Sequence, residues 1–294
     1  MSAATIAQTL VFGLFVGAVY GTAAVGLALV FGVLKVLNVA HGELLMLGGY
    51  ASFWLFTLLG LDPYLSLLVC VPALFLLGLA LERGLFSRVV RFGVETRIKN
   101  SLLISFGLTL ILQQLAILLW TADERSVQTA YSGAGAAVVG VALPFTRLVN
   151  LAIALVAILA LHLFLRRTDF GKAIRATAED WEAASLAGID VQRAYLLTFA
   201  IGAALAGVAG TLVSVGYGVA PTIGLSWTLK ALVVVVLAGT GSILGAFPAG
   251  LLLGVAEALS TFAVGAAYRE VVSLVIFLLV LLLRPQGLFG RETG

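Results

Sequence analysis

The sequence predicts an all-α polytopic membrane protein with about eight or nine transmembrane spans, some of them broken helices, and one helix in a charged cytoplasmic loop. Of the 294 residues, 62% are hydrophobic and only 11% are charged, whereas about 25% are charged in soluble domains. The mean hydropathy is +1.15, and the apolar segments approach the roughly 20 residues that a membrane helix requires. We expect residues 1–294 to form a single transmembrane domain.

Nine apolar segments account for the predicted spans. They are residues 7–33, 44–60, 65–82, 101–120, 148–165, 194–216, 227–243, 249–265 and 269–284. The first follows an N-terminus without the basic region of a cleaved signal peptide, so we expect it to remain as a span. Some of the segments are expected to be half-helices.

Basic residues set the expected orientation, because the loops that carry them face the cytoplasm. They are Arg83, Arg88, Arg91, Arg97, Lys99, Arg166, Arg167, Lys172, Arg175, Arg193, Arg284 and Arg291. The connections at 121–147 and 266–270 are poor in basic residues and are expected to face outward. The C-terminus is then cytoplasmic. The N-terminus lies outside if nine spans cross, and inside if eight cross and a re-entrant piece lies near 35–43; both alternatives remain open.

Glycines four residues apart indicate close helix packing. They are Gly13, Gly17 and Gly21, then Gly241 with Gly245, and Gly250 with Gly254. Small residues at this spacing let helix backbones approach closely in lipid. We therefore expect them at helix contacts, with a minority at unwound segments around a pathway.

A polar cluster, Lys35-Val-Leu-Asn-Val-Ala-His-Gly-Glu43, interrupts the apolar N-terminal part of the chain. Ionisable groups at membrane depth are costly and mark functional positions, so Asn38, His41 and Glu43 are candidates for a site at a helix break. The alternative is a short cytoplasmic turn in which Lys35 and Glu43 are exposed to water. A third interpretation is a proton relay through His41 and Glu43, as in a proton-coupled secondary transporter.

Glu257 lies in the apolar segment AGLLLGVAEALSTFAV, several residues from either predicted end. A carboxylate at this depth should face the interior of the bundle or an aqueous cavity, where it is paired or hydrogen-bonded. Structural pairing and a role on a transport path remain open for this residue.

Other chemistries lack the residues they need. His41-x-Glu43 opens the zinc-deaminase signature, whose second half needs two cysteines, and the chain has only Cys70. The HExxH zinc motif and the GxxxxGK[ST] phosphate-binding loop are also absent. We predict no catalytic site, no metal site and no cofactor bound by this chain. The net charge of +3 reports membrane orientation, and we predict no nucleic-acid partner.

The loop at 166–193 holds ten of the 31 charged residues. Within it, Ile174, Ala178 and Trp181 fall at helical spacing, and Gly188 is a suitable helix stop. These positions predict one amphipathic helix over 171–188 that could dock in the groove of a partner protein.

Within this loop, Glu182-Ala-Ala-Ser-Leu-Ala-Gly188 resembles the EAA-x-x-x-G loop of ABC importer permeases. The segments NVAHGELLMLGGY, TDFGKAIRATAEDWEAASLAGIDV, GTGSILGAFPAGLLLGVAEAL and LLLRPQGLFG look like the permease family for branched-chain amino acids. The likeness runs from Gly17 to Gly290. The chain departs from the fuller loop pattern, whose downstream I-x-L-P has no counterpart where Thr198 and Phe199 stand.

The resemblance implies a transport subunit of the inner (plasma) membrane that is not itself an enzyme. Its partners would be a homologous second permease, two cytoplasmic ATP-binding subunits that use ATP and Mg, and a periplasmic substrate-binding protein. The 166–193 loop would be the coupling loop, with a coupling helix that contacts the ATPase. The expected coupling residues are Trp181, Glu182, Ala183, Ala184 and Gly188.

Translocation of branched-chain, hydrophobic amino acids is the function that this resemblance implies. The expected path residues are Asn38, His41, Glu43 and Glu257. Two alternatives remain: carriage of urea or short amides by the same kind of importer, and an autonomous proton-coupled secondary transporter.

Overall fold

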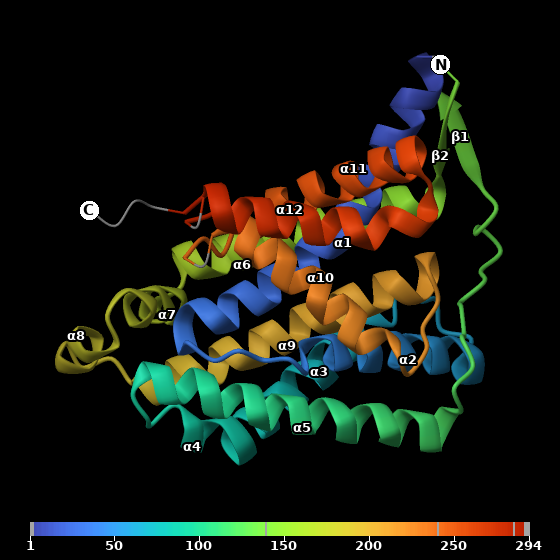
Figure 1. Ribbon diagram of the computed structural model, residues 1–294. Coiled ribbons are helices and arrows are strands. Elements are labelled where there is room, and N and C mark those ends of the chain that lie inside the picture. The colour runs from blue at the N-terminus through green and yellow to red at the C-terminus, as the bar shows by residue number, and fades with distance from the viewer. Residues whose placement is uncertain (1–2, 139, 240, 285, 291–294) are drawn as a thin grey trace.

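Long helices dominate the computed structural model, which describes residues 3–138, 140–239, 241–284 and 286–290 (Figure 1). The long helices are α1 (Ala3–Leu34), α2 (His41–Leu59), α3 (Leu67–Leu81), α5 (Val94–Trp120), α6 (Phe145–Arg167), α9 (Val191–Gly216), α10 (Ile223–Ala238), α11 (Ala246–Val264) and α12 (Arg269–Leu283). The short elements are η1 (Glu82–Phe86), α4 (Ser87–Val89), β1 (Gly135–Val138), β2 (Val141–Pro144), α7 (Asp169–Glu179), α8 (Trp181–Leu186) and η2 (Ala266–Tyr268). Arg291 lies outside the described residues.

The helices confirm an all-α polytopic membrane protein. Within the described residues, eight helical segments are long and apolar enough to cross a membrane, and α10 is a shorter apolar helix. Its 16 residues span about 24 Å, less than the roughly 30 Å hydrocarbon core. The helix within the predicted span at 227–243 is therefore shorter than the full hydrocarbon thickness. The expected interruption near 35–43 is also present, since residues 35–40 are not helical.

The two ends of the described chain lie at opposite ends of the bundle. In Figure 1, α1 begins beside the β1–β2 hairpin, whereas α12 finishes near α7 and the last described residues. An odd number of crossings is needed for this arrangement, and α10 supplies the ninth. The geometry therefore agrees with the nine-crossing alternative.

Helices α1 and α9 form the centre of the bundle. In each of them 83% of the most apolar window is buried, against 22% in α3, α5 and α6. The outer helices carry exposed leucines such as Leu103, Leu118 and Leu282, which suit contact with lipid tails. The core thus lies around two helices that are apolar on every side.

Close glycine contacts join the central helices to their neighbours. A Cβ added to Gly17 would lie 2.6 Å from the Cα of Leu251, and one added to Gly48 would lie 2.7 Å from the Cα of Gly207. The contact of α1 with α11 is the one that the glycine spacing predicts, and the contact of α2 with α9 at Gly48 is a further one of the same kind. Gly241 differs, because it lies in the turn before α11 and a Cβ there would meet no atom of the described residues within 4 Å; it belongs with the minority expected at non-helical segments.

The order of a long central helix, a break and a second helix occurs twice. Helix α1 is followed by the break at 35–40 and α2, and α9 is followed by residues 217–222 and α10. Figure 1 shows α1 and α9 running in opposite directions. Helix α1 of the first half packs on α11 of the second, and α9 of the second half packs on α3 of the first. This reciprocal packing of antiparallel central helices is the relation of two inverted halves. Binding sites in transporters of this kind lie near the breaks, between the halves.

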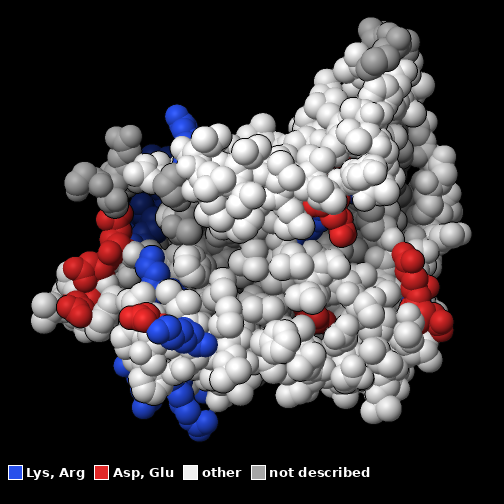
Figure 2. All heavy atoms as spheres, viewed as in Figure 1, with Lys and Arg blue, Asp and Glu red and all other residues white. Residues whose placement is uncertain are grey.

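Charges mark the two ends of the bundle. Figure 2 shows Lys and Arg gathered at the end where α4, α7 and α8 lie, among the acidic side chains of the charged loop. We call this the basic end. At the opposite end, which we call the hairpin end, the β1–β2 hairpin is attached to α1 because the Gln8 side chain bonds both the N–H and the carbonyl of Ala142.

Candidate functional site

The break between α1 and α2 is held by hydroxyl groups from two other helices. The backbone N–H groups of Leu37 and Val39 each donate to a serine of α5, Ser101 and Ser105, over 3.0 Å. Thr228 of α10 accepts from the N–H of Gly42 and donates to the carbonyl of Val39. Unwound backbone at membrane depth persists only where such partners satisfy it. The break is therefore a built feature that joins α5 and α10.

Lys35 and His41 bound this break. Lys35 has a left-handed backbone, with φ of 53°. His41 is 1% exposed, and its Nε2 lies 2.9 Å from the carbonyl oxygen of Ala23 on α1. Since a carbonyl can only accept, Nε2 is the protonated nitrogen. Asn38 accepts from the N–H of Ala40 and so stabilises the turn into α2.

Glu43 is the most unusual group at the break. It is 1% exposed, and both carboxylate oxygens lack a hydrogen-bond partner among the described residues. The carboxylate lies against Gly224, so closely that a Cβ there would overlap it. Gly224 is the second residue of α10, whose N-terminal end carries partial positive charge. The interpretation of Glu43 as an exposed residue in a wet turn is wrong.

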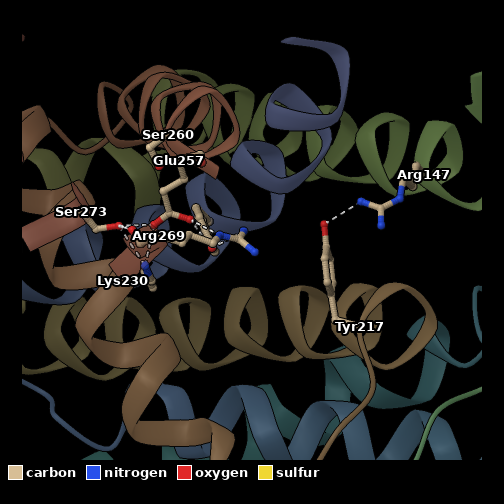
Figure 3. Close-up of polar contacts among 8 residues, drawn as sticks. Arg147, Tyr217, Lys230, Glu257, Ser260, Arg269 and Ser273 are labelled. Carbon is tan, nitrogen blue, oxygen red and sulfur yellow. Dashed lines mark hydrogen bonds and ion pairs between the residues drawn. The ribbon is translucent and has the colours of Figure 1, made fainter. Parts of the chain in front are cut away.

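Glu257 is the centre of a second polar cluster, which we call the Glu257 cluster (Figure 3). The carboxylate is fully buried and accepts from Lys230 Nζ at 2.5 Å, Arg269 Nε at 2.8 Å and the Tyr20 hydroxyl at 2.9 Å. The Ser273 hydroxyl also donates to it. The cluster joins α1, α10, α11 and α12 inside the bundle. Structural pairing of Glu257 is therefore confirmed, and its role on a path stays a prediction.

A cavity of about 180 Å³ lies beside the Glu257 cluster. Its wall includes Tyr20, Tyr217, Trp227, Lys230, Arg269 and Glu270. Neither Lys230 nor Arg269 is among the functional residues predicted from the sequence. The sequence does contain a feature that indicates Lys230: it is a single lysine within the apolar segment LSWTLKALVVVV. A charged residue in such a segment marks a functional position, as it does for Glu257.

The charged loop forms two helices, so the predicted single helix over 171–188 is wrong. Asp180 interrupts it with an extended backbone, at φ of −151° and ψ of 105°. Its carboxylate accepts from the N–H groups of Glu182 and Ala183 at 2.9 and 3.0 Å and so begins α8. An aspartate favours this N-cap role over the helix interior. Gly188, at φ of +83°, ends α8 as predicted.

The apolar stripe of the loop is divided between the interior of this chain and the surface. Ile174 is fully buried, whereas Trp181 is 42% exposed, and α7 packs on α1, α6 and α9. Of the expected coupling residues, Glu182, Ala183 and Gly188 are exposed but Ala184 is buried. The surface open to a partner is therefore the outer side of α8 with Trp181.

A groove of about 570 Å³ lies beside α8 at the basic end. Its wall includes Val90, Phe92, Trp181, Ser185, Ile189 and Tyr195. Under it, buried Arg97 donates to the carbonyls of Leu34, Val90 and Phe92 and to the Tyr195 hydroxyl. This arginine ties the end of α1 to the α4–α5 turn and the start of α9. The groove therefore lies over a hydrogen-bonded network that connects it to the central helices.

Comparison with known families assigns the chain. The family described as "Branched-chain amino acid transport system / permease component" matches residues 9–281. The chain belongs to this permease family. It is similar to the high-affinity branched-chain amino acid transport system permease protein BraD of Pseudomonas aeruginosa, with 37% identity over 97% of this chain and 95% of that protein.

Other relatives share the same description. The permease is 37% identical to the LivH protein of Escherichia coli K12, over 97% of this chain and 95% of that one. It is 29% identical to a probable LivH protein of Methanocaldococcus jannaschii, over 92% and 88% of the two chains. No solved structure matches the permease. The break, the Glu257 cluster and the α8 groove are thus features of a multi-pass transport permease.

Proposed function

We propose that this permease is one membrane subunit of an ATP-binding-cassette importer for branched-chain, hydrophobic amino acids. The observation that carries the proposal is the exposure of Glu182 and Ala183 of α8, and of Gly188 behind it, at the basic end beside the groove. Exposed charges of both signs, on Lys172 and Arg175 of α7 and on Glu182 of α8, suit a partner protein better than lipid. The names of the relatives supply the substrate class.

Four partner subunits complete the proposed importer. A homologous second permease forms the other half of the path, two cytoplasmic ATP-binding subunits hydrolyse ATP with Mg, and a periplasmic binding protein delivers substrate. The basic end, with the C-terminus, faces the cytoplasm, because loops rich in basic residues remain on that side of the membrane. Of the 12 basic residues assigned to cytoplasmic loops, 11 are described, and they lie around α4, α7, α8 and the end of α12. This chain itself uses no cofactor.

Transport follows from the way α7 and α8 are attached. Closure of the ATPase pair moves α8, and α7 transmits the motion because its buried face is packed on α1, α6 and α9. Rigid packed elements move as bodies, so α1 and α9 tilt and the path alternates between its two openings. Asn38, His41 and Glu43 lie where the break in α1–α2 meets α10, at the pivot between the two inverted halves.

Co-purification from native membranes tests the proposal. The permease should retain an ATPase pair and a second permease, identified by mass spectrometry, and Gly188→Asp and Glu182→Lys should lose the ATPases. Asp123→Lys is the matched charge reversal at the hairpin end and should retain them. A wild-type chain that comes away alone, or only with its own copies, would refute the importer.

A proton-coupled carrier is the second candidate, because Glu43 is a buried carboxylate without a partner among the described residues. Vesicles separate the two functions. A carrier accumulates leucine with a proton gradient and this chain alone, whereas the importer requires the ATPases and ATP. Competition by leucine, urea and acetamide in the same assay distinguishes amino acids from short amides as substrates.

A further inference from the structure

We propose that the cavity beside the Glu257 cluster binds one zwitterionic amino acid, with its carboxylate on Lys230 and Arg269 and its ammonium on Glu270. This inference rests on the proposed function, which gives the substrate class, and it adds where and by which groups the permease itself holds the substrate.

The cluster has hydrogen-bond donors to spare. Lys230 uses two of its three N–H groups, on Glu257 and Ser273. Arg269 uses Nε on Glu257 and one N–H of Nη2 on Tyr20. An arginine carries five N–H donors, so three remain on Arg269 and one on Lys230 without a partner among the described residues. Both side chains line the cavity, and Figure 3 shows the Arg269 guanidinium extending from Glu257 toward Tyr217.

The charge balance also selects an anion. One carboxylate, Glu257, pairs with two cations, Lys230 and Arg269, so the Glu257 cluster holds one positive charge in excess, and Glu270 supplies a separate negative charge on the cavity wall. A third cation, Arg147, bonds the far side of Tyr217, its Nη1 being 3.1 Å from the hydroxyl. The Lys230 side chain is 15% exposed and that of Arg269 is 38% exposed, so both can be reached from the cavity, and a carboxylate matches the fork of a guanidinium.

The rest of the wall suits an aliphatic amino acid. The rings of Tyr20 and Trp227 meet edge to face at 5.4 Å between centroids, and Tyr217 adds a third ring at 6.2 Å from Trp227. Glu270 is the acidic residue of the wall and forms no ion pair among the described residues. The volume of about 180 Å³ is below the roughly 300–1,000 Å³ of drug-sized pockets and suits a single small ligand.

The position of the cavity fits an early step of import. Arg269 begins α12 and Tyr217 follows the end of α9, and both ends lie away from α7 and α8 in Figure 1. The cavity therefore lies in the half of the bundle nearer the hairpin end. A substrate released there would meet the cavity before it reaches the break at 35–40.

A binding measurement tests this site. The sample is the assembled permease pair with its ATPases, in nanodiscs and without the binding protein, and the small ligands are added directly to it. The ligands are leucine, leucinamide, which lacks the carboxylate, and 4-methylpentanoate, which lacks the ammonium. Calorimetry should give the tightest binding for leucine, and at least about tenfold weaker binding for leucinamide, because charge-assisted bonds are lost. Equal binding of leucine and leucinamide would overturn the inference.

Two variants assign the groups. Glu270→Gln should weaken leucine at least about tenfold and leave 4-methylpentanoate unchanged, and this exposed residue can be replaced without disturbing the fold. Lys230→Met should weaken the binding of leucine and of 4-methylpentanoate alike.

Glu95→Gln and Lys99→Met, on the exposed start of α5, are the matched controls and should leave the binding of both ligands unchanged. Equal loss of both ligands in Glu270→Gln would exclude an ammonium contact there and overturn the assignment.

Uptake by the complete importer separates the two proposals. If ATP-driven leucine uptake with binding protein is normal but the nanodisc sample binds no leucine at millimolar concentration, the cavity is not a substrate site and the importer stands. If the complete system takes up no leucine, the proposed function fails and the site fails with it.

Discussion

At the residue scale, Glu43 and Glu257 are two buried carboxylates with opposite surroundings. Glu257 is bonded by two cations and two hydroxyls, whereas Glu43 has no partner among the described residues and lies against Gly224. A paired carboxylate holds helices together, and an unpaired one costs folding free energy and is kept for function. The two residues should therefore respond differently to substitution.

Replacement of Glu43 should affect transport without affecting stability. Glu43→Gln keeps the shape of the side chain and removes its charge. We expect this variant to assemble normally and to be at least as resistant to unfolding as the wild type. Its rate of leucine uptake should be lower by about tenfold or more. Uptake and SDS-induced unfolding measured on the same preparation check this, with the exposed Glu95→Gln as control. Unchanged uptake together with lower stability would assign Glu43 a structural role.

Replacement of Glu257 should affect stability first. In Glu257→Leu, Lys230 and Arg269 lose their counter-charge, and removal of one partner of a buried pair costs about 3 kcal/mol or more. The free energy of unfolding from an SDS titration should fall by that amount. Ser260→Ala is the control, since Ser260 bonds only the backbone carbonyl of Glu257 within its own helix and should cost less than about 1 kcal/mol. A small effect of Glu257→Leu would contradict the pairing.

At the element scale, glycine decides how closely α1 meets α11. Gly17 has backbone atoms of Leu251 and Gly250 within 2.6 Å of an added Cβ, whereas the nearest atom to a Cβ on Gly32 is a side-chain carbon of Ile243 at 3.6 Å. Both glycines lie in α1, so Gly32 is a matched control for substitution at Gly17.

Alanine at these two positions should act in opposite directions. Gly17→Ala forces two backbones apart, and overpacking of this kind costs about 1–3 kcal/mol. Gly32→Ala meets ordinary contact and should be neutral or stabilising by up to about 1 kcal/mol. Thermal unfolding midpoints of the two variants in one detergent check the difference. A Gly17→Ala variant as stable as wild type would show that α11 can move away freely.

Local patterns predicted some elements and misassigned others for identifiable reasons. The helix break, the glycine contacts and the stop at Gly188 follow from residues within a few positions of one another, so the sequence contains them. Ile174, Ala178 and Trp181 have helical spacing on both sides of Asp180, so their pattern predicts one continuous helix through this residue. The spacing cannot report that an aspartate caps α8, nor that the apolar face of α7 is covered by α1, α6 and α9 of the same chain.

Contacts between residues far apart in the chain could not be predicted from the sequence. Lys230, Arg269 and Tyr20 meet Glu257 from positions 12 to 237 residues away, and no local pattern relates them. For the same reason the exposure of Glu43 was left open, since Gly224, which covers it, is on α10. Candidate residues were found where they break an apolar run, and their partners required the fold.

At the scale of the whole molecule, two inverted halves explain why the polar residues gather where they do. Each half contributes a central helix, a break and a second helix, and Thr228 of one half bonds the broken backbone of the other. The Glu257 cluster likewise joins α1 to α10, α11 and α12. Motion of one half against the other must therefore change both polar sites together, as alternating access requires.

Orientation in the membrane is the last property to be tested, and the coupling proposal depends on it. The chain has one cysteine, the buried Cys70, so single cysteines can be introduced into a Cys70→Ala background. Gly133 is exposed near the hairpin end, and Glu95 is exposed at the basic end. With nine crossings and a cytoplasmic basic end, Gly133→Cys should react with a membrane-impermeant maleimide in intact spheroplasts. Glu95→Cys should react only after permeabilisation. The reverse pattern would place α8 outside, where no ATPase can reach it, and labelling of both from outside would contradict nine crossings.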